Sequence, residues 1–162
     1  MVKKVKHRKL KGSQGRPAKR RMVIRRAKKA DAVRICSLLA QLGYPDFDSK
    51  ITAERIRVHR QPGYAMLVAE MNGVVVAFIS LHWFELAHWK EKFGRITSFC
   101  VDESCRSQGI GTLLLKAGEA ILTRKKCNKI EVTSNNRRTR AHQFYLGAKY
   151  QEDSRRFTKL TG

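Results

Sequence analysis

The chain of 162 residues contains no apolar run long enough to cross a membrane, no Cys-x-x-Cys pair and no acidic residue before position 31. A membrane-spanning helix needs roughly 18 consecutive apolar residues, so we expect no membrane partner. The charged N-terminus lacks the apolar core of a secretory signal, which favours a cytoplasmic location. The four cysteines lie in or near apolar stretches. Their spacing predicts reduced core thiols rather than disulfides or metal ligands.

Basic residues outnumber acidic ones, and the excess is unevenly placed. The formal net charge is +22; residues 1–30 carry 14 Lys or Arg, and the rest of the chain carries 21 against 13 acids. Residues 1–21 lack apolar periodicity and their charges repel one another, so they are predicted to form a disordered tail. Such a tail can contact a polyanion such as nucleic acid, or it can be a solvated extension without function. The length suggests one further domain, over residues 22–162.

Apolar periodicity divides this domain into strands and helices. Asp31 and Thr52 are predicted near the starts of the first two helices. Asn72-Gly73 is a strong signal for a two-residue hairpin. The predicted order, β-α-α-β-β-β-α-β-α-β-β, indicates a three-layer α/β domain with a mixed sheet. Strands are expected at 22–26, 64–70, 74–81, 94–102 and 129–133, helices at 31–42, 52–59, 110–126 and 137–146, a longer connection at 82–92, and a closing hairpin over Tyr150 and 155–160.

The segment Arg106–Leu115 combines a strand end, a glycine-containing loop and a helix start. Gly109 and Gly111 leave backbone N–H groups uncovered by side chains where the helix begins. Those groups have no partner within the helix, and the helix dipole adds partial positive charge. The loop can therefore accept a diphosphate, with Arg106 supplying a full charge beside it. The alternative is a plain strand-to-helix turn, because short glycine motifs are weak evidence.

Two motifs at their proper separation give the chain a family resemblance. Arg106, Gly109 and Gly111 match the form Arg/Gln-x-x-Gly-x-Gly/Ala of the acetyl-CoA loop in the GNAT superfamily of N-acetyltransferases. The segment from Asn135 to Tyr145 resembles the Asn…Arg…Ala-His-x-Phe-Tyr helix of its small-amine members, among them the aminoalkylphosphonate and aminoglycoside 6′-N-acetyltransferases. The likeness spans about residues 22–160 and implies the GNAT-like three-layer fold.

The resemblance also implies roles for individual residues. Acetyl-CoA would be the cosubstrate, and Tyr145 would be the general acid that protonates the leaving thiolate; the alternative is a core tyrosine. Asn135 would reach the pantetheine arm, or would cap a helix. Glu85 and His82 are the two candidates for the general base, and His88 lies in the same predicted connection. The predicted cofactor-binding residues are Phe99, Cys100, Val101, Arg106, Gln108, Gly109, Ile110, Gly111, Thr112 and Asn135.

The chain departs from its relatives at two informative positions. Ser98 stands where aminoalkylphosphonate enzymes carry a glutamate, and Lys149 stands where Gly is usual. If that position requires a positive φ, Lys149 has a modest steric cost.

The predicted function is transfer of an acetyl group to a primary amine of a small molecule. The alternatives are a protein lysine or N-terminal acetyltransferase, and a catalytically silent acetyltransferase-like domain with a nucleic-acid-binding tail. The other partner considered is a second copy of the chain in a homodimer. The acceptor pocket is expected to use aromatic and acidic side chains, which suit a cationic amine; the candidates are Tyr44, Asp46, Asp48, Trp83, Phe84 and Trp89.

Overall fold

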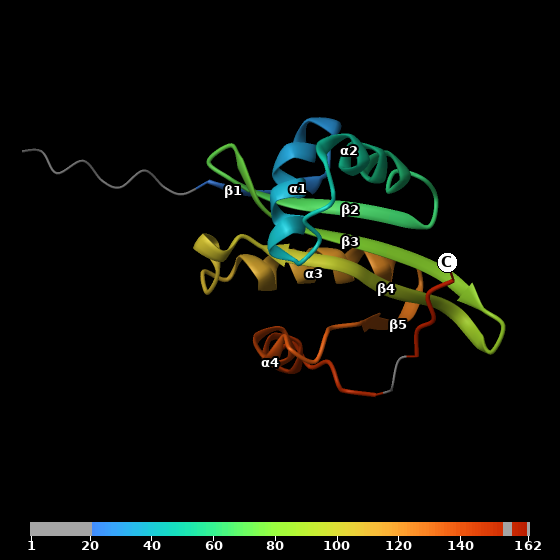
Figure 1. Ribbon diagram of the computed structural model, residues 1–162. Coiled ribbons are helices and arrows are strands. Elements are labelled where there is room, and N and C mark those ends of the chain that lie inside the picture. The colour runs from blue at the N-terminus through green and yellow to red at the C-terminus, as the bar shows by residue number, and fades with distance from the viewer. Residues whose placement is uncertain (1–20, 154–156, 162) are drawn as a thin grey trace, which may run out of the picture.

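A computed structural model describes residues 21–153 and 157–161. Figure 1 shows the arrangement of its helices and strands. The elements are β1 (Met22–Arg26), α1 (Ala32–Gln41), α2 (Ser49–Val58), β2 (Tyr64–Met71), β3 (Val74–Leu86), β4 (Trp89–Val101), α3 (Ile110–Arg124), β5 (Cys127–Val132) and α4 (Thr139–Gly147), with short 3-10 turns η1 (Lys29–Asp31) and η2 (Glu103–Cys105).

The five strands form one mixed sheet in the order β1-β2-β3-β4-β5. The first four are antiparallel neighbours, and β5 runs parallel to β4. Helices α1 and α2 cover one face of the sheet and α3 covers the other (Figure 1). The predicted three-layer α/β fold is therefore confirmed.

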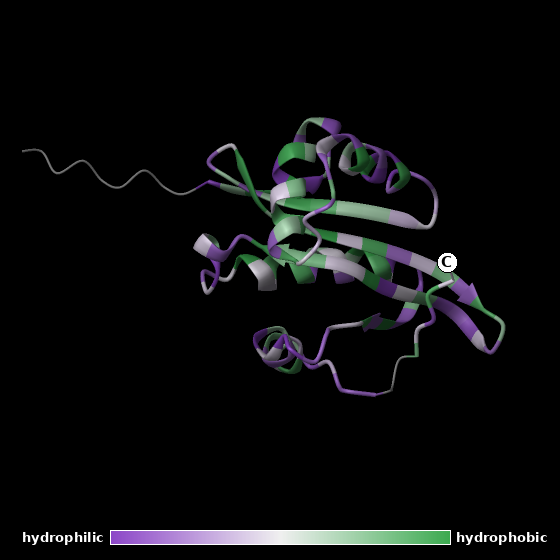
Figure 2. Ribbon diagram, in the orientation of Figure 1, coloured by the Kyte–Doolittle hydropathy of each residue, from purple (hydrophilic) through white to green (hydrophobic). Residues whose placement is uncertain are grey.

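Each face of the sheet has its own hydrophobic core, because side chains along a strand alternate in direction. In β3, Phe78 packs into the core that contains Ile35 of α1 and Ile56 of α2. Its neighbour Ile79 packs into the opposite core, which contains Leu114 of α3. Figure 2 shows hydrophobic colour on the parts of β2 and β3 beneath α1 and α2, and hydrophilic colour on the outer side of α2 and toward the β3–β4 hairpin.

The β2–β3 turn confirms the predicted hairpin. Asn72 and Gly73 have φ values of 51° and 82°, as a type I′ turn requires at both central positions. Gly43, with φ 92°, ends the α1 segment as expected.

The predicted start of the first helix at Asp31 is confirmed, since Asp31 is the N-cap residue of α1, but its capping side chain and the start of the second helix need correction. The Asp31 side chain does not cap α1; it accepts a hydrogen bond from the Lys28 amide and pairs with Arg25, both at 2.7 Å. Helix α2 begins three residues before Thr52, because the carboxylate of Asp48 accepts from the Ile51 amide at 2.7 Å.

The predicted long connection over residues 82–92 is wrong. Strand β3 continues to Leu86 and β4 starts at Trp89, so a tight hairpin replaces the connection. The ring of Phe84 lies 5.7 Å from that of Phe93, its partner across the two strands. Such cross-strand ring pairs stabilise an extended hairpin.

The predicted closing hairpin is not found in the described residues. Residues 148–153 and 157–161 form no strand, and residues 154–156 lie outside the described part of the chain. The predicted disorder of the tail concerns residues 1–21, of which 1–20 also lie outside it. Within residues 21–153 and 157–161, no helix is long and apolar enough to span a bilayer.

Candidate active site

Strand β4 has an open edge near its C-terminal end. Its parallel pairing with β5 ends at Ile96, which faces Val132, although β4 continues for five more residues to Val101. The pairing with β3 shifts register at the same point: Ser80 faces Ser98 while Leu81 faces Ile96, which leaves Thr97 as an extra residue. Backbone groups at such an edge can bind an extended ligand. Residues 97–101 therefore suit the narrow arm of a larger molecule.

Helix α4 brings Tyr145 to this open edge. The ring of Phe99 lies 5.6 Å from that of Phe144 and 6.5 Å from that of Tyr145. Burial raises the pKa of Tyr145 to about 12, while the positive charge of Arg138 acts in the opposite direction. The hydroxyl of Tyr145 therefore keeps its proton at neutral pH, as a proton donor must.

The N-terminus of α3 forms an anion-accepting loop. Ser107 and Gly109 have positive φ values of 62° and 78°. The Leu113 amide donates to the Gly109 carbonyl at 3.1 Å, so the amides of residues 110–112 precede the first α-helical bond. Because α3 is 15 residues long, its dipole reinforces these amides. Backbone N–H groups and dipole together fit a diphosphate.

The two glycines of this loop have different reasons to be glycine. A Cβ on Gly109 would meet no atom within 4 Å, so its positive φ is the constraint. A Cβ on Gly111 would lie 3.4 Å from Cε2 of Phe144 and 3.5 Å from Cγ2 of Val101. Gly109 therefore shapes the backbone of the loop, whereas Gly111 allows α3, β4 and α4 to approach closely.

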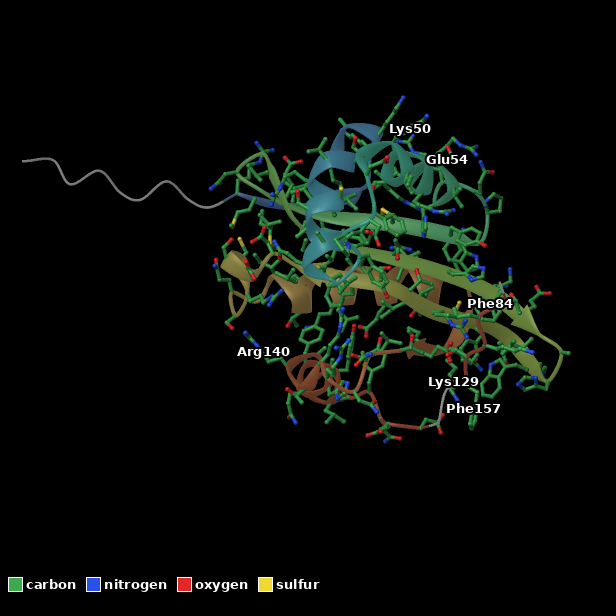
Figure 3. All side chains as sticks on the ribbon, in the orientation of Figure 1. Lys50, Glu54, Phe84, Lys129, Arg140 and Phe157 are labelled. Carbon is green, nitrogen blue, oxygen red and sulfur yellow. The ribbon has the colours of Figure 1, made fainter. Side chains whose placement is uncertain are left out.

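Two arginines lie beside the loop, and only one was predicted. Arg106 donates from Nε to the Val101 carbonyl at 3.1 Å. Arg140, in the first turn of α4, donates from Nη2 to Ser107 Oγ at 3.2 Å; Figure 3 shows it at the end of the sheet opposite Phe84. No local pattern marks Arg140, since the two residues are 33 positions apart. Its membership of the second motif segment was the available signal.

Asn135 does not cap α4, whose N-cap is Arg138, but it lies in the turn before this helix. Its Oδ1 accepts from the Arg137 amide at 3.0 Å, and its carbonyl accepts from the Arg138 amide at 2.9 Å. Nε2 of His142 lies 3.0 Å from the same carbonyl. Asn135 therefore shapes the turn that leads into α4. Its contact with pantetheine stays a prediction.

The two predicted bases are not beside Tyr145. Phe99 faces Ile79 across the sheet, and His82 lies three residues further along β3, about 10 Å at strand spacing. His82 is stacked on Tyr64 at 4.3 Å, and its pKa is lowered by burial and then by the charges of Arg95 and His59. Glu85 is exposed near the β3–β4 hairpin and does not overhang the site.

Several side chains expected in the acceptor pocket have other roles. Trp83 belongs to the α3-side core, on the sheet face opposite α1 and α2. Asp48 caps α2, as described above. The indole of Trp89 donates to Asn128 at 2.7 Å near the hairpin. These three positions therefore do not support the predicted pocket.

Neither metal nor disulfide chemistry is indicated for the described residues. They contain no group of three or more His, Cys, Asp or Glu that could hold a metal ion. The four cysteines are free thiols, and Cys100, Cys105 and Cys127 are buried, in agreement with their prediction as core thiols. Burial raises the pKa of the Cys100 thiol, against the charges of Arg106 and Arg138.

Comparisons with known proteins agree with this geometry. Residues 32–148 match the family described as Acetyltransferase (GNAT) family. The aminoalkylphosphonate N-acetyltransferase of Salmonella typhimurium is 33% identical over 126 residues, which are 77% of this chain and 79% of that protein.

Solved structures show the same fold at low sequence identity. An aminoglycoside N-acetyltransferase, AAC(6')-Iy, in complex with CoA has a TM-score of 0.78 at 17% identity, with 90% of this chain and 97% of that chain covered. Glucosamine-6-phosphate N-acetyltransferase from Arabidopsis thaliana has a TM-score of 0.75 at 18% identity, with 88% and 99% covered.

Proposed function

Because this chain belongs to the GNAT family of acetyltransferases, we propose that it transfers the acetyl group of acetyl-CoA to a primary amine of a small molecule. One observation supports the proposal: the rings of Phe144 and Tyr145 lie beside Phe99 at the open edge of β4, and Phe144 also packs against Gly111 at the start of α3. Bound acetyl-CoA supplies a thioester whose acetyl group is activated for transfer. The relatives named above act on small amines, which supports a small acceptor over a protein.

The residues of this chain divide the binding work between two elements. The amides of residues 108–112 would hold the diphosphate, with Arg106 and Arg140 as flanking cations. The backbone of Phe99, Cys100 and Val101 would bind the pantetheine arm along the open edge of β4. Both ligand regions lie next to Phe144, which packs against Gly111 and Phe99.

The remaining roles are those of the general acid and the general base. Tyr145 would give its proton to the departing sulfur, because its raised pKa keeps the hydroxyl protonated. An alkyl ammonium has a pKa near ~10 and must lose a proton before it attacks. Of the two predicted bases, His82 is closer along β3 and is held neutral by its lowered pKa. We propose that it receives the amine proton through water.

The cofactor assignment is tested by calorimetry with acetyl-CoA on wild type, Gly109→Ala and Gly73→Ala. Both glycines have φ near 80° and no atom within 4 Å of an added Cβ, so both variants place an alanine at a similar positive φ without a steric clash. Only Gly109→Ala places a methyl group among the diphosphate-binding amides, and we expect its affinity for acetyl-CoA to fall about tenfold or more.

The Gly73 variant separates binding from stability. It should unfold as easily as Gly109→Ala while binding acetyl-CoA like wild type. If wild-type protein gives no heat with acetyl-CoA, or if Gly109→Ala binds as well as wild type, the assignment of this loop fails.

We also propose that the basic residues 1–21 bind a polyanion such as nucleic acid. Beside β1, to which this segment leads, Arg26, Arg124 and Lys125 line a hollow of about 620 Å³ and extend the positive charge onto the domain. Deletion of residues 1–21 should leave acetyl transfer intact but weaken retention on heparin and reduce its salt dependence. Unchanged retention on heparin would show that residues outside 1–21 bind the polyanion.

A further inference from the structure

The hollow beside β1 lies between this strand and α3, on the face of the sheet away from α1 and α2. Its volume of about 620 Å³ is within the range of small-ligand sites. Its floor is apolar and comes from β1, β2 and α3, with Ile24, Leu67, Ala117, Ala120 and Ile121. Its rim is basic, with Arg26, Arg124 and Lys125. The hollow therefore offers an apolar surface and positive charge to the same ligand.

The rim cations come from two elements that are far apart in the sequence. Arg26 faces Leu67 across β1 and β2, and Leu67 belongs to the core on the α3 side. The pleat therefore directs Arg26 toward α3. Arg124 and Lys125 stand at the C-terminal end of α3, where cations complement the helix dipole. The dipole does not explain a third cation that comes from β1.

No carboxylate of the described residues pairs with the rim. Arg26 and Arg124 form no ion pair there, whereas Arg25, which also borders the hollow, pairs with two carboxylates. Lys125 Nζ lies 5.5 Å from the ring centroid of Trp83, a contact that leaves its charge unneutralised. Like charges gathered around an apolar surface repel one another, and an anion would remove this repulsion.

From the apolar floor and the unpaired rim we infer that the hollow binds one nucleotide of a single-stranded nucleic acid. The base packs on the floor, and phosphates bind Arg26 and Arg124, since guanidinium groups bind phosphate through paired hydrogen bonds. An unpaired base is free to enter a hollow, whereas a duplex keeps its bases stacked inside and offers only phosphates.

The chain before β1 favours nucleic acid over a small anion. Residues 1–30 carry 14 Lys or Arg and no acid, and they lead directly into β1. A strand of nucleic acid in the hollow continues past one nucleotide, so its further phosphates can meet this basic segment. Two linked contacts on one polyanion strengthen each other. The inference concerns a site on the domain and does not depend on acetyl transfer.

The rim and the cofactor loop belong to opposite ends of α3. This helix has 15 residues, which span about 20 Å at 1.5 Å per residue. Gly109 precedes its first turn, whereas Arg124 and Lys125 end it. Nucleic acid in the hollow and acetyl-CoA at the loop should therefore bind at the same time.

The test measures the Kd of the full chain by fluorescence anisotropy, with a short labelled single-stranded DNA and with the duplex of the same length. It compares wild type with a hollow variant, Arg26→Gln/Arg124→Gln, and a control variant, Arg55→Gln/Arg60→Gln. Arg55 in α2 and Arg60 just after it are exposed, and α2 lies on the opposite face of the sheet (Figure 1). Both variants lose two positive charges, so the comparison separates the hollow from net charge.

Wild type should bind the single strand at least as tightly as the duplex, although the duplex has the higher charge density. The hollow variant should lose about tenfold or more in affinity for the single strand. Its salt slope should fall by about 1.4, since each phosphate contact on a single strand contributes ~0.7. Its affinity for the duplex should change less, so the preference reverses. The control variant should stay within about twofold for both ligands.

Thermal melts establish that the variants are folded. If the hollow variant melts below wild type, Arg124→Gln alone provides the comparison, with a slope change of about 0.7. All these proteins keep residues 1–21, so a failure of the proposed tail contact does not alter the ratio of the two affinities.

Four results would overturn the inference. Wild-type affinity of the hollow variant for the single strand would exclude the hollow, and an equal loss in the control variant would reduce the effect to net charge. Displacement of the DNA by acetyl-CoA would move the strand to the cofactor loop. Tighter binding of the duplex by wild type would show that phosphates alone are bound.

Discussion

Replacing Tyr145 by Phe isolates the one oxygen on which the proposed chemistry depends. The aromatic ring would keep its neighbours, since it packs 5.4 Å from Phe144, 5.6 Å from Tyr150 and 6.5 Å from Phe99. The variant should therefore fold and bind acetyl-CoA like wild type. Only the proton for the departing sulfur is lost.

The expected loss follows from the state of the hydroxyl. With a pKa of about 12, Tyr145 is protonated in almost every molecule between pH 6 and pH 10. A positioned general acid typically contributes about 10²- to 10⁴-fold to a rate. We therefore expect kcat to fall by that factor at all pH values in this range, and the wild-type rate to show no decline near pH 10 from loss of this proton.

The assay is thiol release from acetyl-CoA under saturating donor, and the matched control is Tyr150→Phe. Tyr150 packs on Tyr145 and donates from its hydroxyl to Glu119 at 2.9 Å. Loss of that bond should cost about 1 kcal/mol of stability but reduce kcat by less than threefold. If Tyr145→Phe retains more than a third of the wild-type kcat, or if both variants lose equally, Tyr145 is not the acid.

Two further predictions concern stability. Lys149→Gly relieves a left-handed residue with φ 67° and should add about 1 kcal/mol to the unfolding free energy, which raises Tm by about 2–4 °C in a thermal melt; an equal gain in Lys149→Ala would refute the backbone explanation. The pKa of Tyr145 is about 12 in the folded protein and ~10 in the unfolded chain. Its contribution to the free energy of unfolding is therefore full below pH 10 and declines between pH 10 and pH 12. In urea unfolding, wild type should lose up to about 3 kcal/mol of stability relative to Tyr145→Phe over that interval, and parallel pH profiles of the two proteins would contradict this prediction.

Most of the fold could be predicted because its signals are local. The turn at Asn72-Gly73 needs two positive φ values, and those residues are the ones that adopt them at low cost. The β3–β4 hairpin was missed because rings such as Phe84 and Phe93 pair across strands. Read along the chain, the same aromatic and polar residues resemble a loop. The closing hairpin was predicted from a weak apolar pattern that forms no strand in residues 148–153 and 157–161.

Candidate site residues could be proposed where a motif spans consecutive residues, whereas contacts between remote residues could not. Gly109 and Gly111 stand in one short loop, so a cofactor-binding role could be proposed for them from their spacing together with the family resemblance. Arg138 meets Leu42 across 96 positions, and Arg140 meets Ser107 across 33. No residue next to either arginine in the sequence indicates these partners. Glu85 lies far from the site because β3 extends to Leu86, whereas the sequence pattern predicted a strand that ended at residue 81.

The departure of Lys149 from the family pattern connects the fold to the proposed acid. The Lys149 amide donates to the Leu146 carbonyl and the Tyr150 amide to the Tyr145 carbonyl, both at 2.9 Å. This pair of bonds is the Schellman arrangement that ends a helix with a residue of positive φ. The ring contact between Tyr150 and Tyr145 is its usual apolar contact.

Tyr145 is thus held from two directions. Its carbonyl is fixed by the end of α4, and its ring is fixed between Phe144 and Tyr150, which is tied to α3 through Glu119. The helix end must adopt this geometry whichever residue follows it, so the strain at Lys149 persists because surrounding contacts determine the backbone. A glycine at this position would make the same cap at lower cost, which is why a gain in stability without a change in kcat is the expected signature of Lys149→Gly.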